Sequence, residues 1–500
     1  MKKMGFLIPS PIKKYFRRWR KSGGNRQNTP PDIVALRQQL LNFPLQFPVN
    51  QILYRGEKIW PVFRFELWRT LRAVYEGRDN KINPQKPMLP PGWEKEYRER
   101  CGAISIDELA TDGPLDFLFF VNQRGVEQFS GPEGVYNRIT DPIFEAACTV
   151  GTAQKIELLK SRGPLETNRV HPPIYLVPPQ LRSIGHMQLL DAPSNFAGML
   201  QATFPAIRFR DNDVREIVEW YFHQYDIYYQ ILTRMRPKCV FFMGFEFHLA
   251  LSHAAADLGI KSVDLQHGTQ TGWGPLYKWW DEMPPEGYKM LPDYFCVWGK
   301  RDFDHLSGAI PSAKHQPIIG GFPWIERQKD LGAPVSGALK AKFASYKKVI
   351  LVTLQHQNAV PDILSATIAQ SPPDYLWLLR KHPKGRSPKA SGALAGKNVV
   401  ISPEIDNVVL SHLLPLVDVH MTAGSTVVLE ADYFGVPSIV WDVTGVENYE
   451  EMIEEGLVHS AYTGAECASI LATLERRPAA GSEAICVTDT AAVLRSLVTL

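Results

Sequence analysis

Short apolar runs separated by longer mixed segments recur along the chain from about residue 115. In the first half these runs lie at 116–121, 155–159, 173–177, 239–243, 262–265, 293–298 and 317–319. Strands that are apolar on both sides are typical of a parallel sheet covered by helices on both faces. The segments between them have helical spacing, and the longest spans 214–235. This alternation predicts a doubly wound α/β domain.

A second series of the same kind follows a segment rich in Gly, Pro, Ala and Lys at 328–344. Its apolar runs lie at 348–354, 375–379, 417–421 and 438–441. Single cores rarely exceed about 250–300 residues, so a chain of this length needs more than one domain. We therefore predict two Rossmann-like doubly wound domains, 111–332 and 333–480, followed by a C-terminal helix at 481–500.

The residues before these domains have a different pattern. Residues 33–41 and 63–75 have helical apolar spacing, which predicts a helical N-terminal extension at 29–110. The aromatic-rich stretch 59–68 is interpreted as a packing segment of this extension and not as a platform for sugars.

A basic tail, residues 1–28, precedes the extension. Within it Ile12, Tyr15, Phe16 and Trp19 have helical spacing, and Lys and Arg fill the positions between them. Such a basic amphipathic segment is suited to lie on an anionic membrane surface, so residues 12–21 are a predicted membrane contact. The alternative is a disordered basic tail.

Composition narrows the class of protein. The net charge of +3 is too small to argue for a nucleic-acid partner, and 45% hydrophobic with 21% charged residues is ordinary for a globular protein. The six cysteines show no CxxC spacing, which indicates reduced thiols and neither a disulfide framework nor a zinc site. No run of about 18 apolar residues is present to span a bilayer. We expect a cytoplasmic protein, peripheral at the inner membrane face if the tail binds lipid.

One candidate phosphate site follows the apolar run 417–421. A turn containing Gly424, Ser425 and Thr426 precedes a predicted helix that carries Glu430 and ends at Gly435. A helix N-terminus favours phosphate, and the two hydroxyls add donors. Glu430, one turn later, suits the paired hydroxyls of a ribose. The alternative is that Ser425 is an ordinary N-cap and Glu430 is solvated.

A second candidate loop follows the apolar run 375–379. It begins with Arg380 and contains Lys381, His382 and Pro383. Ligands of open α/β sheets bind outside the carboxyl ends of strands. This loop and the one at 425 are therefore predicted to hold the same phosphate or diphosphate.

The first domain has its own polar strand end. Gln266, His267 and Gly268 follow the run 262–265, and Glu246 follows 239–243. His267 suits the role of general base because an imidazole titrates near neutral pH, and Glu246 is the other candidate. The alternative is that His267 only holds the loop. Gly320 and Gly321, at a later strand end, are predicted to let the backbone approach a ligand closely.

Three other features of the sequence bear on its function. Asp211, Asn212 and Asp213 match a DxD metal-diphosphate pattern but precede a long helix, so a capping role is preferred. Glycine-rich phosphate fingerprints are absent, which counts against a dehydrogenase or a P-loop NTPase. The acidic segment 446–457 is predicted to be a solvated helix face.

The His-Pro turn at 382, the Ser/Thr-rich helix start, Glu430 and the Gly-Val-Pro at 435–437 together resemble the nucleotide-binding half of GT-B fold glycosyltransferases. The similarity is to bacterial capsule and surface-polysaccharide enzymes, namely sialyl- and polysialyltransferases, Kdo transferases and CDP-glycerol polymerases. It covers roughly 345–445. The Gln-His-Gly at 266–268 is similar to an element of the CDP-glycerol polymerases.

The resemblance implies two domains that face each other across a cleft. It implies that His382, Ser425 and Thr426 contact the donor's phosphate, with no essential metal and no cofactor beyond the nucleotide-sugar co-substrate. The expected activity is transfer of a sugar from a CMP-, CDP- or UDP-linked donor to a surface polysaccharide or lipid-linked acceptor. The alternatives are a CDP-glycerol-type polyol-phosphate transferase, a hydrolysing UDP-sugar 2-epimerase, and a non-enzymatic subunit of a capsule complex.

Overall fold

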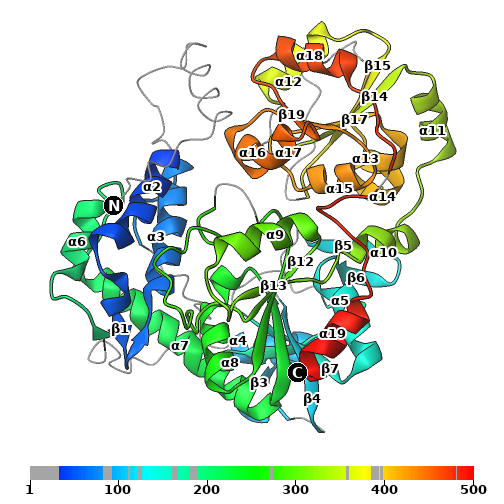
Figure 1. Ribbon diagram of the computed structural model, residues 1–500. Helices are drawn as coiled ribbons and strands as arrows, with labels where there is room; N and C mark the ends of the chain where they lie inside the picture. The colour runs from blue at the N-terminus through cyan, green and yellow to red at the C-terminus, as the bar shows by residue number, and fades with distance from the viewer. Residues whose placement is uncertain are drawn as a thin grey trace.

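The computed structural model describes residues 33–82, 93–110, 113–121, 127–159, 167–179, 190–270, 274–355, 360–383, 394, 398–479 and 481–499. The chain forms two α/β domains, each built on a parallel sheet between helices, with a group of N-terminal helices beside the first (Figure 1). The predicted architecture of two Rossmann-like domains with a helical N-terminal part is therefore confirmed. The basic segment 12–21 lies outside the described residues.

The first sheet has eight strands in the order β13-β12-β11-β10-β4-β7-β8-β3, and neighbouring strands are parallel throughout. Its strands are β3 (Ile104–Ser105), β4 (Leu115–Val121), β7 (Ala153–Leu158), β8 (Ile174–Val177), β10 (Pro237–Met243), β11 (Lys261–Leu265), β12 (Tyr294–Val297) and β13 (Gln316–Ile319). The helices α5 (Thr140–Val150), α7 (Asp211–Met235), α8 (Leu249–Asp257) and α9 (Lys300–Ala309) belong to this domain. The central strands are buried on both faces, as their apolar sequences predict.

The second sheet has six parallel strands in the order β16-β15-β14-β17-β18-β19. They are β14 (Lys348–Thr353), β15 (Tyr375–Arg380), β16 (Val399–Val400), β17 (Val419–Thr422), β18 (Ser438–Val440) and β19 (Val458–Ser460). In chain order this is the arrangement 3-2-1-4-5-6 of a Rossmann fold. The strand order reverses between β14 and β17, where such folds bind ligands.

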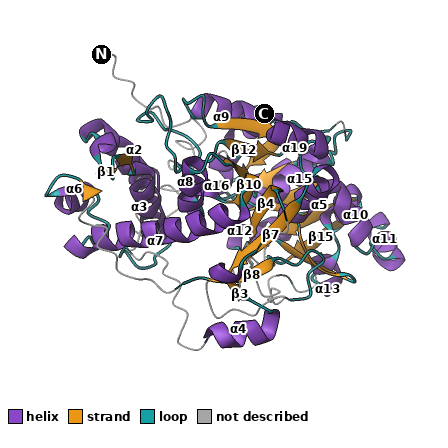
Figure 2. Ribbon diagram, turned by 90° about the horizontal axis from the view of Figure 1, so that it is seen from below, coloured by secondary structure: helices purple, strands orange, loops and turns teal. Residues whose placement is uncertain are grey.

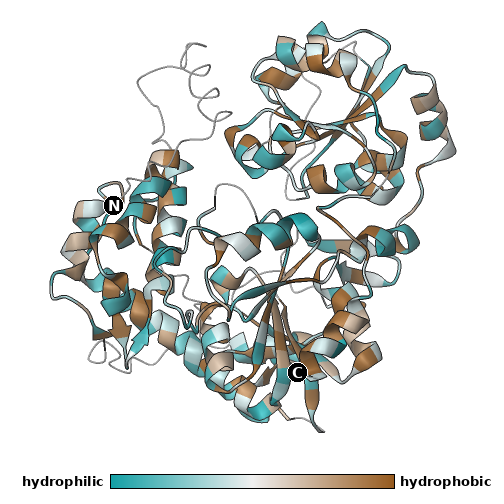
Figure 3. Cartoon of the chain, viewed as in Figure 1, coloured by the Kyte–Doolittle hydropathy of each residue, from teal (hydrophilic) through white to brown (hydrophobic). Residues whose placement is uncertain are grey.

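Helices surround this second sheet on both faces (Figure 1). They are α12 (Asp362–Gln370), α13 (Pro403–Asn407), α14 (Leu410–Leu413), α15 (Val427–Tyr433), α16 (Val443–Asn448), α17 (Glu450–Glu454) and α18 (Gly464–Thr473). Figure 3 shows the result of this layering, with apolar residues concentrated on the strands and on the inner sides of the helices.

The N-terminal helices α2 (Ile33–Gln46) and α3 (Trp60–Tyr75) pack together and against the beginning of α7 (Figure 2). Trp60, Phe63 and Trp68 of α3 are 0–5% exposed, which confirms that the aromatic stretch packs the extension. A small antiparallel sheet in the order β2-β1-β9 and helix α6 (Phe196–Thr203) complete the group; the strands are β1 (Leu53–Tyr54), β2 (Glu57–Lys58) and β9 (Leu190–Asp191). The extension is therefore closed by residues that follow β8 in the chain.

A buried arginine attaches α3 to the segment after the His267 loop. Arg64 is 1% exposed, and its guanidinium donates to the Glu282 carboxylate at 2.5 Å. It also donates to the carbonyl oxygens of Pro275, Lys278 and Trp279 at 2.6–2.9 Å. Five fixed donors in one plane suit arginine for such a role. The extension and the first domain thus form one packed body.

The C-terminal segment returns to the first domain. After α18 the chain crosses back, and α19 (Thr490–Thr499) packs against α5 and β10 (Figure 1). On the way Cys486 exchanges backbone hydrogen bonds with Trp298 and Phe322 at 2.9 Å. The outward connection runs through α10 (Trp324–Leu331) and α11 (Gly337–Ala344). Two chain crossings therefore join the domains.

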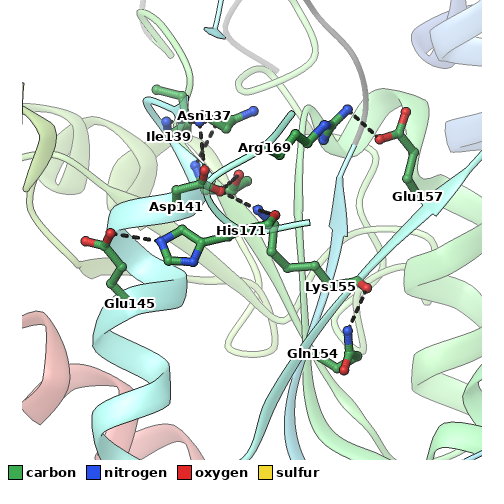
Figure 4. Close-up of polar contacts among 10 residues, drawn as sticks. Asn137, Ile139, Asp141, Glu145, Gln154, Lys155, Glu157, Arg169 and His171 are labelled. Atoms are coloured by element: carbon green, nitrogen blue, oxygen red, sulfur yellow. Dashed lines mark hydrogen bonds and ion pairs between the residues drawn. The ribbon is translucent and has the colours of Figure 1, made fainter. Parts of the chain in front are cut away.

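Buried ion pairs lie under α5 in the first domain (Figure 4). Lys155 of β7, 1% exposed, donates to Asp141 at the start of α5 and to the His171 carbonyl. Arg169 donates to Glu157 of the same strand at 2.7 Å. Strand β7 was predicted from its apolar positions. Its charged residues, Lys155 and Glu157, can be buried because Asp141 and Arg169 compensate their charges.

No helix among the described residues is long and apolar enough to cross a membrane. The predicted capping role of the acidic triplet at 211–213 is confirmed for Asp213, whose carboxylate accepts from the Arg210 N–H at 2.7 Å at the start of α7.

Candidate active site between the two domains

The two predicted phosphate loops lie at the same edge of the second sheet. Strands β15 and β17 both pair in parallel with β14, and Arg380 and Thr422 are both level with Thr353. Adjacent strands are about 4.8 Å apart, so the ends of β15 and β17 are about 10 Å apart. His382 and Ser425 follow these two ends. They therefore flank the β14 end at the point where strand order reverses.

Ser425 and Thr426 form the turn that leads into α15. The Ser425 Oγ accepts from the Val427 N–H at 3.3 Å, which is the capping role that the sequence also allowed. A hydroxyl that accepts one bond retains its own O–H to donate. Helix α15 has only seven residues. Because the dipole of so short a helix is small, the hydroxyls and nearby cations must provide most of any interaction with phosphate.

Gly424 allows two turns of the second domain to pack backbone against backbone. A Cβ on Gly424 would lie 3.0 Å from the Gly445 nitrogen, and a Cβ on Gly445 would lie 2.0 Å from the Ala423 oxygen. Tyr449, which follows α16, donates its hydroxyl to the Ser425 carbonyl at 2.6 Å. The turn at 424–426 is therefore fixed from behind by α16.

The loop after β15 is held by Asp406. Its carboxylate accepts from the Lys381 N–H at 2.8 Å and lies 3.6 Å from Lys381 Nζ. His382 is half-buried beside this pair and Pro383 is exposed. Part of the Lys381 charge is therefore compensated within the chain, and His382 becomes the more important predicted contact. Asp406 was not identified from the sequence, because nothing in its own neighbourhood distinguishes it from a surface carboxylate.

Glu430 lies deeper than its predicted ribose role requires. It is 5% exposed, and burial raises the pKa of its carboxyl, while the charges of Arg138 and Arg380 oppose that shift. Arg380 itself donates to the carbonyl oxygens of Ile405 and Val408 at 2.8 and 2.5 Å. Burial lowers the pKa of Arg380 to about 10. Contact between Glu430 and a ribose stays a prediction.

The two candidate bases of the first domain are neighbours. Gly244, at the end of β10, has a φ of +70°, and a Cβ there would lie 3.5 Å from both Glu246 Oε2 and His267 Cε1. Both side chains are half-buried. Asp264 lies nearby and is fully buried, and burial together with the Glu246 charge raises its carboxyl pKa strongly. An imidazole and two carboxyl groups thus share one strand edge.

Gln266 holds the His267 loop in place. Its amide nitrogen donates to the Gly268 carbonyl at 2.8 Å and to Asp302 at 2.7 Å, and its amide oxygen accepts from the Trp298 N–H at 2.6 Å. The residue is 1% exposed. Gln266 is therefore a positioning residue for His267, and Asp302 is a partner that the sequence did not reveal.

The loops of the two domains meet directly. A Cβ on Gly268 would lie 3.4 Å from Thr426 Cγ2, which is ordinary van der Waals contact. The carboxyl ends of both sheets therefore face each other, with the candidate base on one side and the candidate phosphate turn on the other. Two Rossmann-like domains that face each other in this way define the GT-B architecture.

Charged side chains connect the domains beside this contact. Arg37 of α2 donates to Glu447 of α16 at 3.1 and 3.3 Å, and Arg301 of α9 donates to Glu455 at 2.9 and 2.6 Å. Glu447 is 5% exposed. The prediction that 446–457 is a solvated helix face holds for Glu451, Glu454 and Glu455, which are exposed, but not for Glu447, which is buried against Arg37.

Gly320 and Gly321 lie close to other segments of the protein. A Cβ on Gly320 would lie 2.1 Å from Cys296 Sγ, and one on Gly321 would lie 2.7 Å from Thr488 Oγ1. The hydroxyls of Thr488 and Thr490 donate to the Gly320 carbonyl at 2.9 and 3.1 Å. The close approach that these glycines allow is thus made by the returning C-terminal segment. Their predicted contact with a ligand stays a prediction.

No group of three or more His, Cys, Asp and Glu side chains suited to a metal ion occurs among the described residues. All six cysteines are free thiols. The predicted independence from metals stays a prediction.

No protein family and no curated protein matches the sequence. Similar solved structures include a Listeria monocytogenes protein assigned as a UDP-N-acetylglucosamine 2-epimerase, with a TM-score of 0.49, 13% identity and 77% of this chain and 96% of that chain covered. The UDP-GlcNAc 2-epimerase from Neisseria meningitidis bound to UDP-GlcNAc has a TM-score of 0.44, 14% identity and coverage of 78% and 100%. The glycotransferase of kitacinnamycin has a TM-score of 0.43, 15% identity and coverage of 77% and 95%. Likenesses at this level carry no argument about the reaction.

Proposed function

We propose that the protein is a glycosyltransferase that moves a sugar from a nucleotide-sugar donor to a surface polysaccharide or glycolipid acceptor. The observation that carries the proposal is the contact between Gly268 and Thr426. It brings a loop with a candidate base to a turn with candidate phosphate donors. Transfer between two substrates needs such a meeting point, because both must be held together for the bond to form.

The donor side of the reaction is assigned to the second domain. His382, Ser425 and Thr426 would donate hydrogen bonds to the phosphate that leaves, and Lys381 would add charge. Negative charge on this phosphate grows as the bond from the sugar's anomeric carbon to the phosphate oxygen breaks. Donors that are already in place stabilise that charge without reorganisation, which is commonly the largest catalytic contribution.

The acceptor side is assigned to the first domain. His267 or Glu246 would take the proton of the acceptor hydroxyl as its oxygen bonds to the anomeric carbon, while the phosphate leaves with the bonding electrons. The two groups are close enough to cooperate, with one as the base and the other orienting or compensating it. Gln266 keeps the loop rigid, which such a proton transfer requires.

The experiment that tests the proposal is a donor screen with mass-spectrometric readout. The full-length protein is incubated with CMP-, CDP- and UDP-linked sugars and with CDP-glycerol, with and without lipid-linked or oligosaccharide acceptors. The expected result is an acceptor heavier by one sugar and free nucleotide in equal amount. Turnover of CDP-glycerol alone would replace the proposal by polyol-phosphate transfer. Nucleotide binding without transfer to any acceptor would favour a non-enzymatic subunit.

A UDP-sugar 2-epimerase is the second candidate, favoured by one observation. Glu246, Asp264 and His267 form a group of acid and base side chains at one strand edge. Hydrolysing epimerisation removes a proton from the sugar ring as UDP leaves, and then adds water at the anomeric carbon and returns a proton to the ring from its other face, which such groups can assist. In the same screen, epimerised sugar and free UDP formed without any acceptor would identify this reaction.

A further inference from the structure

A pocket opens beside Glu246. Its walls come from three parts of the chain, namely α3 of the N-terminal extension, α7, and the segment from Glu246 into α8. The space between these walls, including the open mouth, is about 690 Å³. Because the extension supplies one wall, the first domain alone would not form this pocket.

The lining combines aromatic rings with a few polar groups. The rings are those of Phe65, Trp220, Tyr221 and Phe247. Phe65 and Phe247 contact each other edge to face, with ring centroids 5.4 Å apart, which joins the extension to the segment after Glu246. Rings that form a wall offer a flat apolar surface to the C–H face of a sugar ring, whereas polar groups at the edge bind its hydroxyls.

The charges of the pocket indicate which ligand it suits. Glu66 is 8% exposed and accepts from the Arg69 guanidinium at 3.1 and 2.5 Å. The positive charge of Arg69 is therefore compensated by the Glu66 carboxylate, and Glu246 adds a second carboxyl group to the pocket. Gln224 contributes an uncharged amide. This set of groups disfavours a phosphate or a carboxylate ligand and suits a hydroxyl-rich, uncharged one.

The position of the pocket connects it to the reaction. Glu246 lines the pocket and its carboxylate lies in the same neighbourhood as His267, around Gly244. The next residue after His267 contacts Thr426. The candidate bases therefore lie next to the pocket on one side, and the loop that carries His267 lies next to the turn at 424–426.

We propose that this pocket binds the terminal sugar of the acceptor, an uncharged hexose or N-acetylhexosamine, and presents its hydroxyl to Glu246 and His267. The name "acceptor" rests on the proposed glycosyl transfer. The binding of a sugar in this pocket does not depend on that transfer. It also gives the N-terminal extension a role, because α3 forms one wall of the acceptor site.

Binding is tested by saturation-transfer difference NMR on the full-length protein. The probes are methyl glycosides of glucose, galactose, mannose and N-acetylglucosamine, the corresponding disaccharides, and the methyl glycoside of sialic acid as an anionic comparison. Phe65→Ala removes one ring, and Gln224→Trp fills the pocket. Their matched controls are Tyr229→Ala and Gln230→Trp, because both residues are exposed on α7 outside the pocket. Unchanged melting temperatures check that the variants fold.

The expected result is a signal from at least one neutral glycoside that falls at least fivefold in both pocket variants and stays within about twofold in both controls. No signal from any probe, equal loss in the controls, or a stronger signal from the sialic acid glycoside overturns the proposal. If the pocket variants lose glycoside binding while no nucleotide binds to the protein, glycosyl transfer fails and the sugar pocket stands. If transfer is observed and the acceptor KM is the same in the pocket variants, the pocket proposal fails and glycosyl transfer stands.

Discussion

Gly268 of the first domain lies against Thr426 of the second, with 3.4 Å between the position of a Gly268 Cβ and Thr426 Cγ2. The two residues are 158 positions apart in the chain, from the difference between 426 and 268. They follow β11 and β17, so the contact fixes the relative position of the two strand edges. A longer side chain that extends toward Thr426 would push the two loops apart.

The first prediction compares two substitutions at this contact. Gly268→Ala is expected to keep turnover within about twofold, because a Cβ at 3.4 Å is an ordinary contact. Gly268→Leu is expected to lower turnover at least tenfold, since an error of about 1 Å in placing reactants has effects of that order or more. Turnover with the donor found in the screen is the measurement, and melting temperatures check folding. Equal turnover in both variants would contradict a closed arrangement at this point.

The second prediction concerns the ion pair between Arg37 and Glu447, whose side chains are 11% and 3% exposed. Arg37→Met leaves a buried carboxylate without its cation and is expected to cost about 3 kcal/mol of unfolding free energy. Adding Glu447→Gln is expected to recover most of that loss. The control is Arg72→Met, which breaks an exposed pair with Glu76 on α3 and should cost less than about 1 kcal/mol.

Urea unfolding measures the free energies, and small-angle scattering measures the separation of the domains. The radius of gyration is expected to increase in Arg37→Met and to stay unchanged in the control Arg72→Met. If Arg37→Met and Arg72→Met have the same effect on both quantities, the pair does not hold the domains together.

The third prediction is a dependence of stability on pH at the domain interface. Burial raises the pKa of Glu450 to about 7 from 4.5, and the charge of Glu454 adds to this shift. Burial also raises the pKa of Asp302 to about 6 from 3.8. Both groups hold a proton in the folded protein at pH values where the unfolded chain has lost it. Their contribution to stability is complete below about pH 4 and is lost as the pH rises through 6 to 7.

Melting temperatures between pH 4.5 and 8 measure this effect. Glu450→Gln is expected to flatten the decrease between pH 5 and 7, because an amide does not titrate. Glu475→Gln is the control, since Glu475 is exposed. The interpretation fails if the pH profile of Glu450→Gln has the slope of the unchanged protein.

The fourth prediction concerns the buried network of Figure 4, in which Lys155 and Asp141 are 1–2% exposed as side chains. Lys155→Met is expected to destabilise the protein by about 3–5 kcal/mol, because Asp141 then keeps a buried charge. Asp141→Asn added to it removes that charge while an amide oxygen still accepts from the Asn137 N–H, a bond of 2.8 Å in the unchanged protein. The double variant is expected to be more stable than the single one in urea unfolding.

Much of the fold follows from local patterns. The runs predicted at 116–121 and 262–265 are β4 and β11, and the long helix predicted at 214–235 is α7, which begins at Asp211. Apolar periodicity is sufficient there because β4 and β11 are almost entirely buried and α7 keeps one apolar face buried. The two loops predicted to bind phosphate do lie at one sheet edge, since parallel strands bring their carboxyl ends together.

The features that were missed depend on contacts between distant residues. Arg37 and Glu447 are 410 positions apart, and neither has a neighbour in the sequence that indicates the pairing. The return of the C-terminal segment to Gly320 could not be read from the glycines, which equally suit a bound ligand. The pocket beside Glu246 is assembled from Phe65, Trp220 and Phe247, which belong to three separate segments. Such sites become visible only when the elements are placed in space.

The loops at His382 and Ser425 are proposed to hold the same leaving phosphate, and the other roles assigned to the site depend on this shared contact. Isothermal titration with UDP, CDP and CMP tests it in the unchanged protein, His382→Ala and Ser425→Ala, with His459→Ala on the edge strand β19 as the control. At least one nucleotide is expected to bind, and each of the two loop variants is expected to weaken it about 10- to 100-fold, the effect of one charge-assisted hydrogen bond. The control should bind like the unchanged protein. A nucleotide that binds with the same Kd to His382→Ala and Ser425→Ala as to the unchanged protein would contradict the claim.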